Sequence, residues 1–437
     1  MRMVDLINKK KYGGSLTADE IDFIVKGYTS GDIPDYQMSA FLMAVYFNGM
    51  NKEEIANLTL SFVNSGERVD LSCIKGIKVD KHSSGGVGDK LTLIIIPLAA
   101  LAGVPVVKMS GRGLGHTGGT IDKLESIEGF RTDLTFQELI SNVEKYNMAI
   151  VGQSSNLTPA DKKIYTLRDV TGTVDSIPLI ASSIMSKKIA AGADCIVLDV
   201  KAGRGAFMKT VEEARLLART MVGIGQSLGI KTVAVISNMN QPLGCEVGNA
   251  NEVKEAIEVL RGNGPQDVKE TAITIASHMA VLGGIYKDFN IAYKNLKDFI
   301  ATGKALEKFR ELVKIQGGNT KVIDNPEVLL PQAKFHIEVK SSHKGYVNSI
   351  DAEKIGLAAM LLGAGRKVKE DKIDYAAGIT LMKKTGDKVC EGETLCVLHT
   401  NYNDAREAIS IVEEAYSIGC EVPEQEKYIY ETISSDE

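Results

Sequence analysis

Two glycine-rich stretches decide the fold predicted for this chain: KVDKHSSGGVGDKLT, residues 78–92, and VVKMSGRGLGHTGGTIDKLES, residues 106–126. Each stretch begins as a short strand, continues as a loop with Ser, Lys and Gly, and then enters a helical run. This order predicts parallel strands joined by right-handed crossovers. Because ligands bind at the carboxyl edge of such a sheet, we expect both loops to border one site.

The same alternation extends along the chain beyond these loops. We expect strands at residues 77–80, 104–108, 195–200 and 232–236. Thr210 and Glu213 form a capping box that predicts a helix from 211 to about 228, between the last two strands. A strand, a helix and a second strand in that order indicate a parallel pair within an α/β unit.

The N-terminal part of the chain has a different, helical pattern over residues 1–65. Two capping residues, Thr17 and Asn51, are each followed three positions later by a glutamate, as at the start of a helix. Residues 160–190 interrupt the α/β pattern with helical, Ser/Lys-rich sequence. We expect this segment to pack against the N-terminal helices rather than against the sheet.

The predicted fold class is α/β plus α. It has a small helical domain, a larger α/β domain with a mixed or parallel sheet, and a C-terminal α+β domain resembling a barrel-sandwich. The expected boundaries are 1–65 with 160–190 for the helical domain, 70–155 with 191–330 for the α/β phosphate-binding domain, and 345–437 for the C-terminal domain. Residues 330–345 are interpreted as a linker, and 401–418 as a helix followed by a strand.

Composition narrows the possible partners. The chain has 437 residues, 44% hydrophobic and 24% charged, which allows several domains with substantial cores. Its net charge is −5, so it has no basic surplus with which to neutralise nucleic-acid phosphates. The most apolar run, 91–102, is too short to span a bilayer, and the N-terminus lacks the apolar core of a signal peptide. We expect a cytoplasmic protein without a nucleic-acid or membrane partner. Its six scattered cysteines are expected to be buried in a reducing compartment.

Both glycine loops have the chemistry of an anion site. Glycine lets backbone N–H groups turn inward, the following helix start adds partial positive charge, and Lys81 adds a full charge. One such loop is as often a tight turn, but two at successive strand ends favour an anion site. Neither loop fits a P-loop or a dinucleotide fingerprint. His82 adjoins this site and is able to donate to a leaving group, although lone histidines are more often structural. His116, in the second loop, is expected to be structural.

A third segment of interest is TLRDVTGTVDSIPLIASSIMSKK, residues 166–188. A helix over 178–188 places Ser183 and Lys187 on one face, since they are four residues apart. A hydroxyl and an ammonium group together suit the carbonyl oxygens of a planar base, with Arg168 as a further donor. Composition alone favours the simpler interpretation of a solvated helix.

These motifs together resemble a known family. SGRGLGHTGGTIDKLES (110–126) is similar to the signature of thymidine and pyrimidine-nucleoside phosphorylases, and KHSSGGVGDK (81–90) and LRDVTGTVDSIPLIASSIMSKK (167–188) resemble the same family. The resemblance covers essentially the whole chain. It implies a homodimer, with a cleft between the helical domain and the α/β domain in each subunit.

The resemblance also implies a set of site residues. It implies that phosphate is held by Lys81, His82, Ser83, Thr92, Lys108, Met109, Ser110 and Thr120. It implies that the pyrimidine is held by His82, Arg168, Ser183 and Lys187, of which His82, Arg168 and Lys187 are catalytic. It further implies a potassium ion bound by backbone carbonyls of Gly88, Lys90, Leu243 and Glu246 and by the carboxylate of Glu255. No organic cofactor is expected.

The implied activity is phosphorolysis of uridine, thymidine and deoxyuridine to the free base and α-D-(deoxy)ribose 1-phosphate, in nucleoside salvage. Lys108 favours broad specificity, because strict thymidine enzymes tend to carry an apolar residue there. A thymidine-specific phosphorylase and an anthranilate-type phosphoribosyltransferase, which needs Mg²⁺, are the alternatives. A carrier module is a third alternative, because residues 383–401 resemble the hairpins of biotinyl or lipoyl domains. The carrier lysine motif is not evident there, however.

Overall fold

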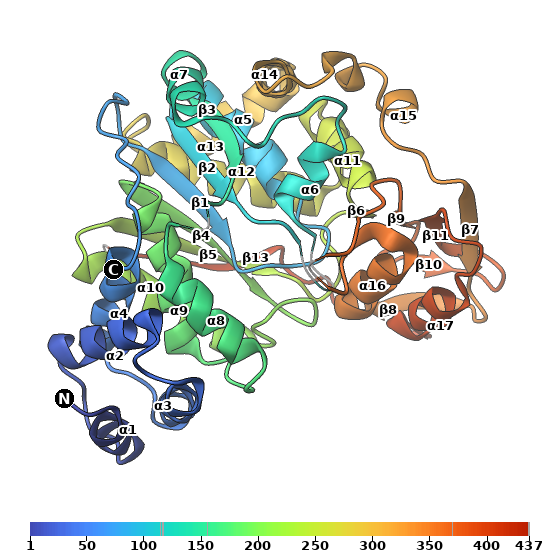
Figure 1. The fold of residues 1–437 in the computed structure, drawn as a ribbon. Helices are drawn as coiled ribbons and strands as arrows, with labels where there is room; N and C mark the ends of the chain where they lie inside the picture. The colour runs from blue at the N-terminus through green and yellow to red at the C-terminus, as the bar shows by residue number, and fades with distance from the viewer. Residues whose placement is uncertain (114, 116–117, 155, 369, 436–437) are drawn as a thin grey trace.

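The computed structural model describes residues 1–113, 115, 118–154, 156–368 and 370–435, which form three units that follow one another across the molecule (Figure 1). The first unit is helical and contains α1 (Met3–Lys11), α2 (Ala18–Ser30), α3 (Asp35–Asn48) and α4 (Lys52–Asn64). The predicted capping boxes at Thr17 and Asn51 are confirmed, since each side chain accepts from the N3 amide and each N3 glutamate accepts in return.

Two later helices complete the helical unit: α8 (Pro159–Asp169) and α9 (Ile177–Ala190). Their apolar residues Ala160, Ile164 and Leu179 belong to the same buried cluster as the N-terminal helices. The expectation that 160–190 packs against those helices is therefore confirmed. The expectation that it does not pack against the sheet is wrong for α9, because Met185 shares a buried cluster with Leu198 of β4.

The central sheet has the strand order β1–β4–β5–β13. Its parallel strands are β1 (Val79–Ser83), β4 (Cys195–Ala202) and β5 (Lys231–Asn238), and β13 (Ile429–Ser434) is antiparallel to β5. The sheet is mixed, as the predicted fold class allows. The first strand was predicted too early, at 77–80, because pairing with β4 continues to Ser83, which is opposite Asp199.

A second, two-stranded parallel sheet contains β2 (Val106–Ser110) and β3 (Met148–Gly152). The prediction of 104–108 for β2 was two residues early. The sequence interpretation missed β3 altogether, because its short run MAIVG is apolar throughout and lacks the alternation of a half-buried strand.

Helices cover both sheets. They are α5 (Leu91–Ala102), α6 (Thr120–Glu125), α7 (Phe136–Tyr146), α10 (Val211–Ser227), α11 (Ala250–Leu260), α12 (Gln266–Leu282), α13 (Phe289–Ala301) and α14 (Lys304–Ile315), followed by η1 (Thr320–Ile323) and α15 (Pro326–Leu329). The capping box predicted for Thr210 and Glu213 begins α10. Helix α5 is apolar on every side because it is buried among other helices, with α12 and α14 against it.

The C-terminal unit has two small sheets and two short helices. One sheet has the order β6 (Glu246–Gly248), β9 (Gly378–Leu381), β11 (Thr394–Thr400), β7 (Phe335–Lys340). The other has the order β10 (Lys388–Val389), β8 (Gly345–Ile350), β12 (Tyr416–Gly419). The helices are α16 (Ala352–Ala359), which continues into η2 (Met360–Ala364), and α17 (Arg406–Ala415).

Two expectations for this region are corrected. Residues 330–345 are not only a linker, because β7 lies within them and pairs along its length with β11. The helix predicted at 401–418 is shorter, since β12 begins at Tyr416 directly after α17.

The expectation of buried cysteines is confirmed for only two of the six. Cys73, Cys390 and Cys420 are exposed, Cys245 is half-buried, and only Cys195 and Cys396 are buried. All six are free thiols. Separately, within the described ranges no helix combines the length and the apolarity that a membrane crossing requires.

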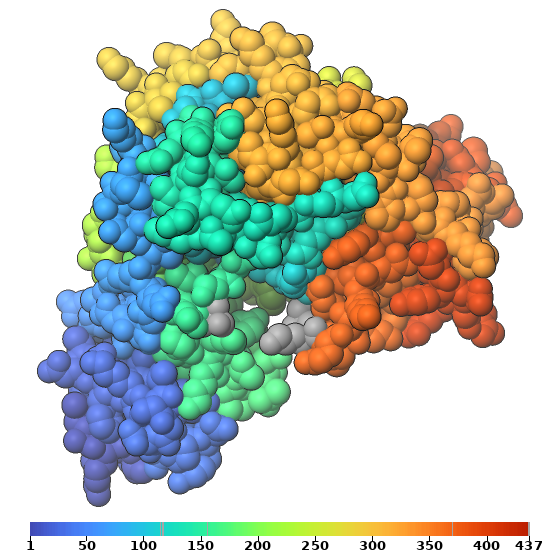
Figure 2. All heavy atoms as spheres, turned by 45° about the horizontal axis from the view of Figure 1, so that its top comes forward, coloured from blue at the N-terminus to red at the C-terminus, as the bar shows by residue number. Residues whose placement is uncertain are grey.

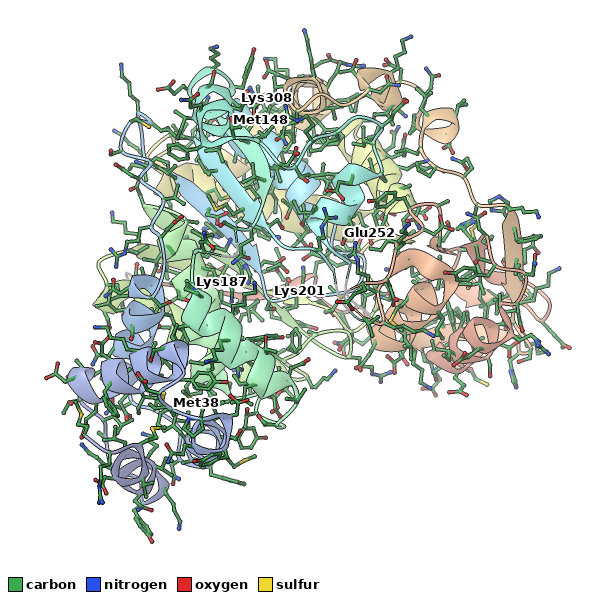
Figure 3. All side chains as sticks on the ribbon, in the orientation of Figure 1. Met38, Met148, Lys187, Lys201, Glu252 and Lys308 are labelled. Atoms are coloured by element: carbon green, nitrogen blue, oxygen red, sulfur yellow. The ribbon has the colours of Figure 1, made fainter. Side chains whose placement is uncertain are left out.

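The surface is hollowed where the helical unit, the sheets and the C-terminal unit meet (Figure 2). Lys187 and Lys201 lie toward this middle part of the molecule, and Glu252 lies on the side of the C-terminal unit (Figure 3).

Candidate functional site

The two glycine loops begin at the same edge of the molecule. Strand β1 ends at Ser83, opposite Asp199 of β4, and β2 ends at Ser110, opposite Gly152 of β3. A cavity of about 200 Å³ lies at this carboxyl edge. All eight predicted phosphate ligands line it: Lys81, His82, Ser83, Thr92, Lys108, Met109, Ser110 and Thr120.

Four lysines converge on this cavity: Lys81, Lys108, Lys187 and Lys188. Asp80, one residue before Lys81, lies behind them and is buried. Its Oδ2 is 2.8 Å from the Lys188 ammonium group, and its Oδ1 is 3.4 Å from that of Lys108. Because all four lysines reach the cavity wall, the cavity is suited to an anion.

A second buried carboxylate, Asp199, supports the floor of the site. It lies 2.8 Å from the Lys201 ammonium group and 3.8 Å from that of Lys81, and it accepts from Ser237 at 2.5 Å. Burial opposes the charge on Lys201, but the Asp199 carboxylate raises the pKa of Lys201 above its usual value. In Asp89, burial likewise opposes ionisation, but the charges of Lys81 and Lys201 lower its pKa. Asp89 therefore stays ionised beside these lysines.

The same environment sets the protonation of two residues on the cavity wall. Burial and the charges of Lys188 and Lys108 hold the pKa of His82 well below its usual range, so its imidazole is neutral near pH 7. Burial lowers the pKa of Lys108 to about 7, against the opposing effect of Asp80. The Lys108 ammonium group also donates to the Lys81 carbonyl at 2.5 Å.

The second glycine loop, with described residues 111–113, 115 and 118–119, is folded back on itself. A Cβ built on Gly119 lies 2.1 Å from the Gly113 nitrogen, so only glycine fits there. Asp122, fully buried in α6, accepts from the Gly113 N–H at 2.7 Å. His116 lies outside the described residues.

The C-terminal unit also holds this loop. The guanidinium group of Arg366 binds both oxygens of Asp122, at 2.8 and 3.0 Å, and donates to the Gly113 carbonyl at 3.1 Å. Such a bidentate pair fixes orientation as well as distance. Sequence reasoning missed Arg366, because nothing in the local sequence shows that it contacts a loop so far away along the chain.

Helix α9 brings Ser183 and Lys187 together as predicted, with the Lys187 ammonium group 2.7 Å from the Ser183 hydroxyl. The same ammonium group binds Asp161, a buried residue of α8 that sequence reasoning did not single out. Lys187 lines the cavity, whereas Ser183 does not. The structure therefore brings only one of these two predicted base contacts into the cavity wall.

Arg168 is also placed away from the cavity wall. It is buried, and its guanidinium group donates to the carbonyl oxygens of Thr173 (3.1 Å), Val174 and Leu179 (3.3 Å). These contacts hold the turn between α8 and α9 in place. In this arrangement Arg168 supports the helix that carries Lys187.

The predicted potassium ligands lie together but are already engaged. The Gly88 carbonyl accepts from the Lys90 backbone N–H at 2.9 Å, and the Lys90 carbonyl accepts from Leu93. The Lys90 ammonium group donates to the carbonyls of Leu243 and Glu246, at 2.8 and 2.7 Å, and to the carboxylate of Glu255. As arranged, the predicted set therefore does not fit a potassium ion, because a lysine of the chain takes its place.

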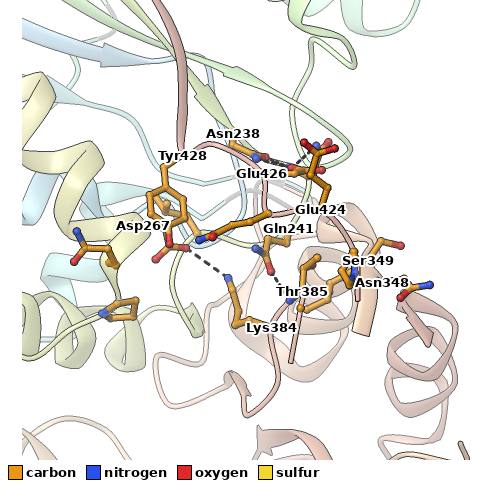
Figure 4. Close-up of a pocket in the computed structure, with 18 of the residues that line it drawn as sticks. Asn238, Gln241, Asp267, Asn348, Ser349, Lys384, Thr385, Glu424, Glu426 and Tyr428 are labelled. Atoms are coloured by element: carbon orange, nitrogen blue, oxygen red, sulfur yellow. Dashed lines mark hydrogen bonds and ion pairs between the residues drawn. The ribbon is translucent and has the colours of Figure 1, made fainter. Parts of the chain in front are cut away.

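A larger cavity, about 530 Å³, lies elsewhere, between the sheet and the C-terminal unit (Figure 4). Lys384 crosses it, 3.6 Å from the Asp267 carboxylate, and donates to the Gly244 carbonyl at 2.7 Å. Thr385 donates to Gln241 from the same hairpin. Of the predicted site residues, only Leu243 lines this cavity, so it is distinct from the candidate site.

The carboxylates behind the site were not predicted from the sequence. Asp80 and Asp199 occupy buried positions in strands β1 and β4. A charged residue within a buried strand is a usable signal, because such residues are retained only with a partner. Lys188 gave a weaker signal in the sequence, because it follows Lys187 in a helix whose polar residues are typical of a solvent-exposed face.

Comparisons with known proteins find family models that match parts of all three units. Residues 75–306 match a family model described as the a/b domain of a glycosyl transferase family, and 4–66 match the helical bundle domain of the same kind of family. Residues 346–419 match a model described as the pyrimidine nucleoside phosphorylase C-terminal domain.

Individual relatives are similar over nearly the full length. The chain is 58% identical over 421 residues to a pyrimidine-nucleoside phosphorylase of Bacillus subtilis (strain 168), covering 96% of this chain and 97% of that one. It is 57% identical over 418 residues to one of Staphylococcus haemolyticus (strain JCSC1435), covering 96% of each. An anthranilate phosphoribosyltransferase from Thermus thermophilus has a similar fold, with a TM-score of 0.58 at 17% identity over 71% of this chain and 98% of that chain.

Proposed function

The chain belongs to the pyrimidine-nucleoside phosphorylase family of pentosyltransferases, and on that basis we propose that it cleaves pyrimidine nucleosides with inorganic phosphate. The proposed substrates are uridine, thymidine and deoxyuridine, and the products are the free base and α-D-(deoxy)ribose 1-phosphate. One observation carries the proposal: Lys81 and Lys108 from the strands and Lys187 from α9 line a single cavity. An anion and a nucleoside held there contact both the α/β unit and the helical unit.

Phosphate is proposed to bind on the strand side of the cavity. The charges of Lys81 and Lys108 attract it, and the hydroxyls of Ser83 and Ser110 and the first turn of α5, with Thr92, supply donors. Asp80 and Asp199 hold the lysines in place from behind. This arrangement supports an anion site at the carboxyl ends of β1 and β2.

The pyrimidine is proposed to bind on the α9 side, against Lys187 and His82. Since His82 is neutral, one ring nitrogen carries a proton and donates to a base oxygen without adding charge. Lys187 supplies a positive charge where negative charge develops on the leaving base. Arg168 and Ser183 are proposed to position α9 and Lys187, in keeping with their contacts.

The proposed reaction is a displacement at C1′ of the sugar. A phosphate oxygen forms a bond to C1′ while the C1′–N1 bond breaks, and N1 keeps the electron pair and then takes up one proton. Attack from the face opposite the base inverts C1′, so a β-nucleoside gives an α-sugar 1-phosphate. Holding the two reactants in line contributes about 7–11 kcal/mol to lowering the barrier in favourable cases.

Closure of the cleft is proposed to bring the two ligands together, with hinges at 66–76, 155–165 and 188–193. These segments lie side by side in the structure where described. Glu67 donates to the Asn156 carbonyl at 3.0 Å, and Val69 donates to the Ala190 carbonyl at 2.8 Å. Three chain crossings at one place favour a hinge. Solution scattering with and without phosphate and a nucleoside should show compaction, and unchanged dimensions would contradict closure.

Broad substrate use is proposed from Lys108, through a hydrogen-bond network reaching the ribose 2′-hydroxyl. The test is phosphorolysis of uridine, thymidine and deoxyuridine by the wild type and by Lys108→Met, in phosphate without Mg²⁺. The wild type should consume all three, and the variant should lose uridine activity more than thymidine activity. Consumption of thymidine alone contradicts broad use, and no consumption of any nucleoside contradicts the proposed function.

The remaining parts of the proposal concern assembly and the rival enzyme. A cytoplasmic location and a homodimer are proposed. Sedimentation equilibrium of the purified protein tests the homodimer directly. The likeness to anthranilate phosphoribosyltransferase concerns the fold alone, while relatives at 57% and 58% identity support the phosphorylase. The Mg²⁺-free assay also separates these two reactions.

A further inference from the structure

Lys90 immediately precedes α5, and its side chain is completely buried. Its ammonium group donates to the carbonyl oxygens of Leu243 and Glu246, at 2.8 and 2.7 Å, and to the Glu255 carboxylate. An ammonium group has three N–H donors, so these three acceptors satisfy it completely. The cation is thus bound by oxygen atoms from a loop, a strand and a helix.

The charge at this position is already balanced. The Glu255 carboxylate is paired with Lys90, and Glu252, one turn earlier in α11, is paired with Lys123 at 3.0 Å. All four side chains are buried. A potassium ion on the same oxygen atoms would lie against the Lys90 ammonium group, and like charges that close repel strongly where water is excluded.

The Lys90 contacts also hold the first glycine loop, residues 84–90, against a neighbouring segment. Gly88 has φ +73°, and a Cβ built there lies 2.6 Å from the Leu243 carbonyl oxygen. From another side, the Lys384 ammonium group donates to the Gly244 carbonyl at 2.7 Å. The segment is therefore held by two ammonium groups, and the loop that lines the candidate site is fixed against it.

We propose that Lys90 is a built-in monovalent cation, whose ammonium group occupies the position that the family resemblance assigns to potassium. The protein then needs no K⁺ to keep the first glycine loop in place. Lys90 is a positioning residue, because it contacts backbone and Glu255 and does not line the candidate cavity. The inference is independent of the proposed reaction, since unfolding without substrate tests it.

The first arm of the test uses the wild type. Thermal unfolding is measured in KCl, NaCl and tetramethylammonium chloride at equal ionic strength, after the protein has been exchanged extensively into the last. The melting temperature should be the same in all three salts. A melting temperature, or a phosphorolysis rate, that rises specifically with K⁺ overturns the inference.

The second arm removes the ammonium group. Lys90→Ser leaves the oxygen atoms of Leu243, Glu246 and Glu255 facing an open polar space. Its melting temperature should be lower than that of the wild type in tetramethylammonium chloride and should rise with K⁺ to a plateau. Its KM for phosphate should rise and then recover with K⁺, with less change in kcat. A folded Lys90→Ser protein that does not respond to K⁺ overturns the inference.

Two control variants make the second arm specific. Lys90→Met fills the same space without a charge and should lose stability with no response to K⁺. Lys10→Ser breaks another buried pair, in which the Lys10 ammonium group lies 2.8 Å from Glu54 in the helical unit. An equal K⁺ response of Lys10→Ser overturns the inference, because it shows general charge compensation. If Lys90→Ser does not fold in any of the three salts, the wild-type arm decides alone. In that arm, an unchanged melting temperature in K⁺ supports the inference.

Discussion

The Lys188 ammonium group lies 2.8 Å from the Asp80 carboxylate, which joins helix α9 to strand β1. The residue before it, Lys187, binds Asp161 of α8 on the other side. Two consecutive lysines therefore join α9 to both units that border the candidate cavity. This explains how a helix of the helical unit holds charged groups at the edge of the sheet.

Replacing Asp80 tests this arrangement. Asp80→Asn removes the charge that faces both Lys108 and Lys188 in a buried setting. Breaking a buried pair from one side typically costs about 3–5 kcal/mol of unfolding free energy. We expect a loss of that order in chemical denaturation, together with a higher KM for phosphate.

The matched control is Glu414→Gln, which breaks the exposed pair with Lys354 at 2.8 Å. Its midpoint of unfolding should hardly change, because exposed pairs contribute little. Equal effects of the two substitutions contradict a supporting role for Asp80.

Replacing Lys187 tests the base side of the site. Lys187→Met keeps most of the side-chain volume but removes the ammonium group. In the wild type, this group lines the cavity and binds Asp161. We expect kcat for uridine phosphorolysis to fall by roughly 10²–10³-fold, the range seen when a single donor to a developing negative charge is removed. The KM for phosphate should change less.

Lys162→Met is the control, since Lys162 is exposed on α8 beside Asp161. It should keep wild-type activity. Circular dichroism should show both variants folded. Full activity of Lys187→Met removes Lys187 from the proposed base site.

Much of the architecture follows from local sequence signals. The capping boxes, the helical N-terminus and the strand–helix–strand order were predicted and are confirmed, because each depends on residues close together in the chain. The eight predicted phosphate ligands line one cavity because six lie in the last three positions of β1 and β2, and Thr92 and Thr120 lie in the first turns of α5 and α6.

What was missed depends on contacts between distant residues. No pattern in the local sequence predicts the ion pair of Arg366 with Asp122 or that of Lys188 with Asp80. The same holds for Lys90, which was expected to offer only its backbone carbonyl. Its side chain turns instead toward Glu255, and only the fold brings those two residues together.

The pKa of Lys108 predicts a pH dependence. Its value in the folded protein is about 7, below the ordinary 10.5, because burial disfavours the charge. Between these values the unfolded chain binds more protons at this residue, so its contribution makes unfolding free energy rise with pH. For phosphate the sign is opposite: the charge that attracts the anion is present below pH 7 and is lost above it.

We therefore expect kcat/KM for phosphate in the wild type to fall as pH rises through about 7, since this ratio reports groups of the free enzyme. Lys108→Met should show a flatter profile, and dividing the two profiles removes the titration of phosphate itself. Parallel profiles would show that Lys108 does not titrate in this range.

Arg366 provides the last prediction, which concerns the C-terminal unit. It does not line the candidate cavity, but it binds both oxygens of Asp122 and the Gly113 carbonyl, and so holds the second glycine loop. Arg366→Met leaves Asp122 with Arg112, a partner that is half exposed. The loop should then sample other arrangements, and the KM for phosphate should rise roughly 10-fold, which corresponds to about 1.4 kcal/mol of binding free energy. Arg310→Met is the matched control, because it breaks a bidentate pair with Asp324 at 2.7 and 2.9 Å far from the loop. A similar KM in both variants would mean that the C-terminal unit does not position the phosphate loop.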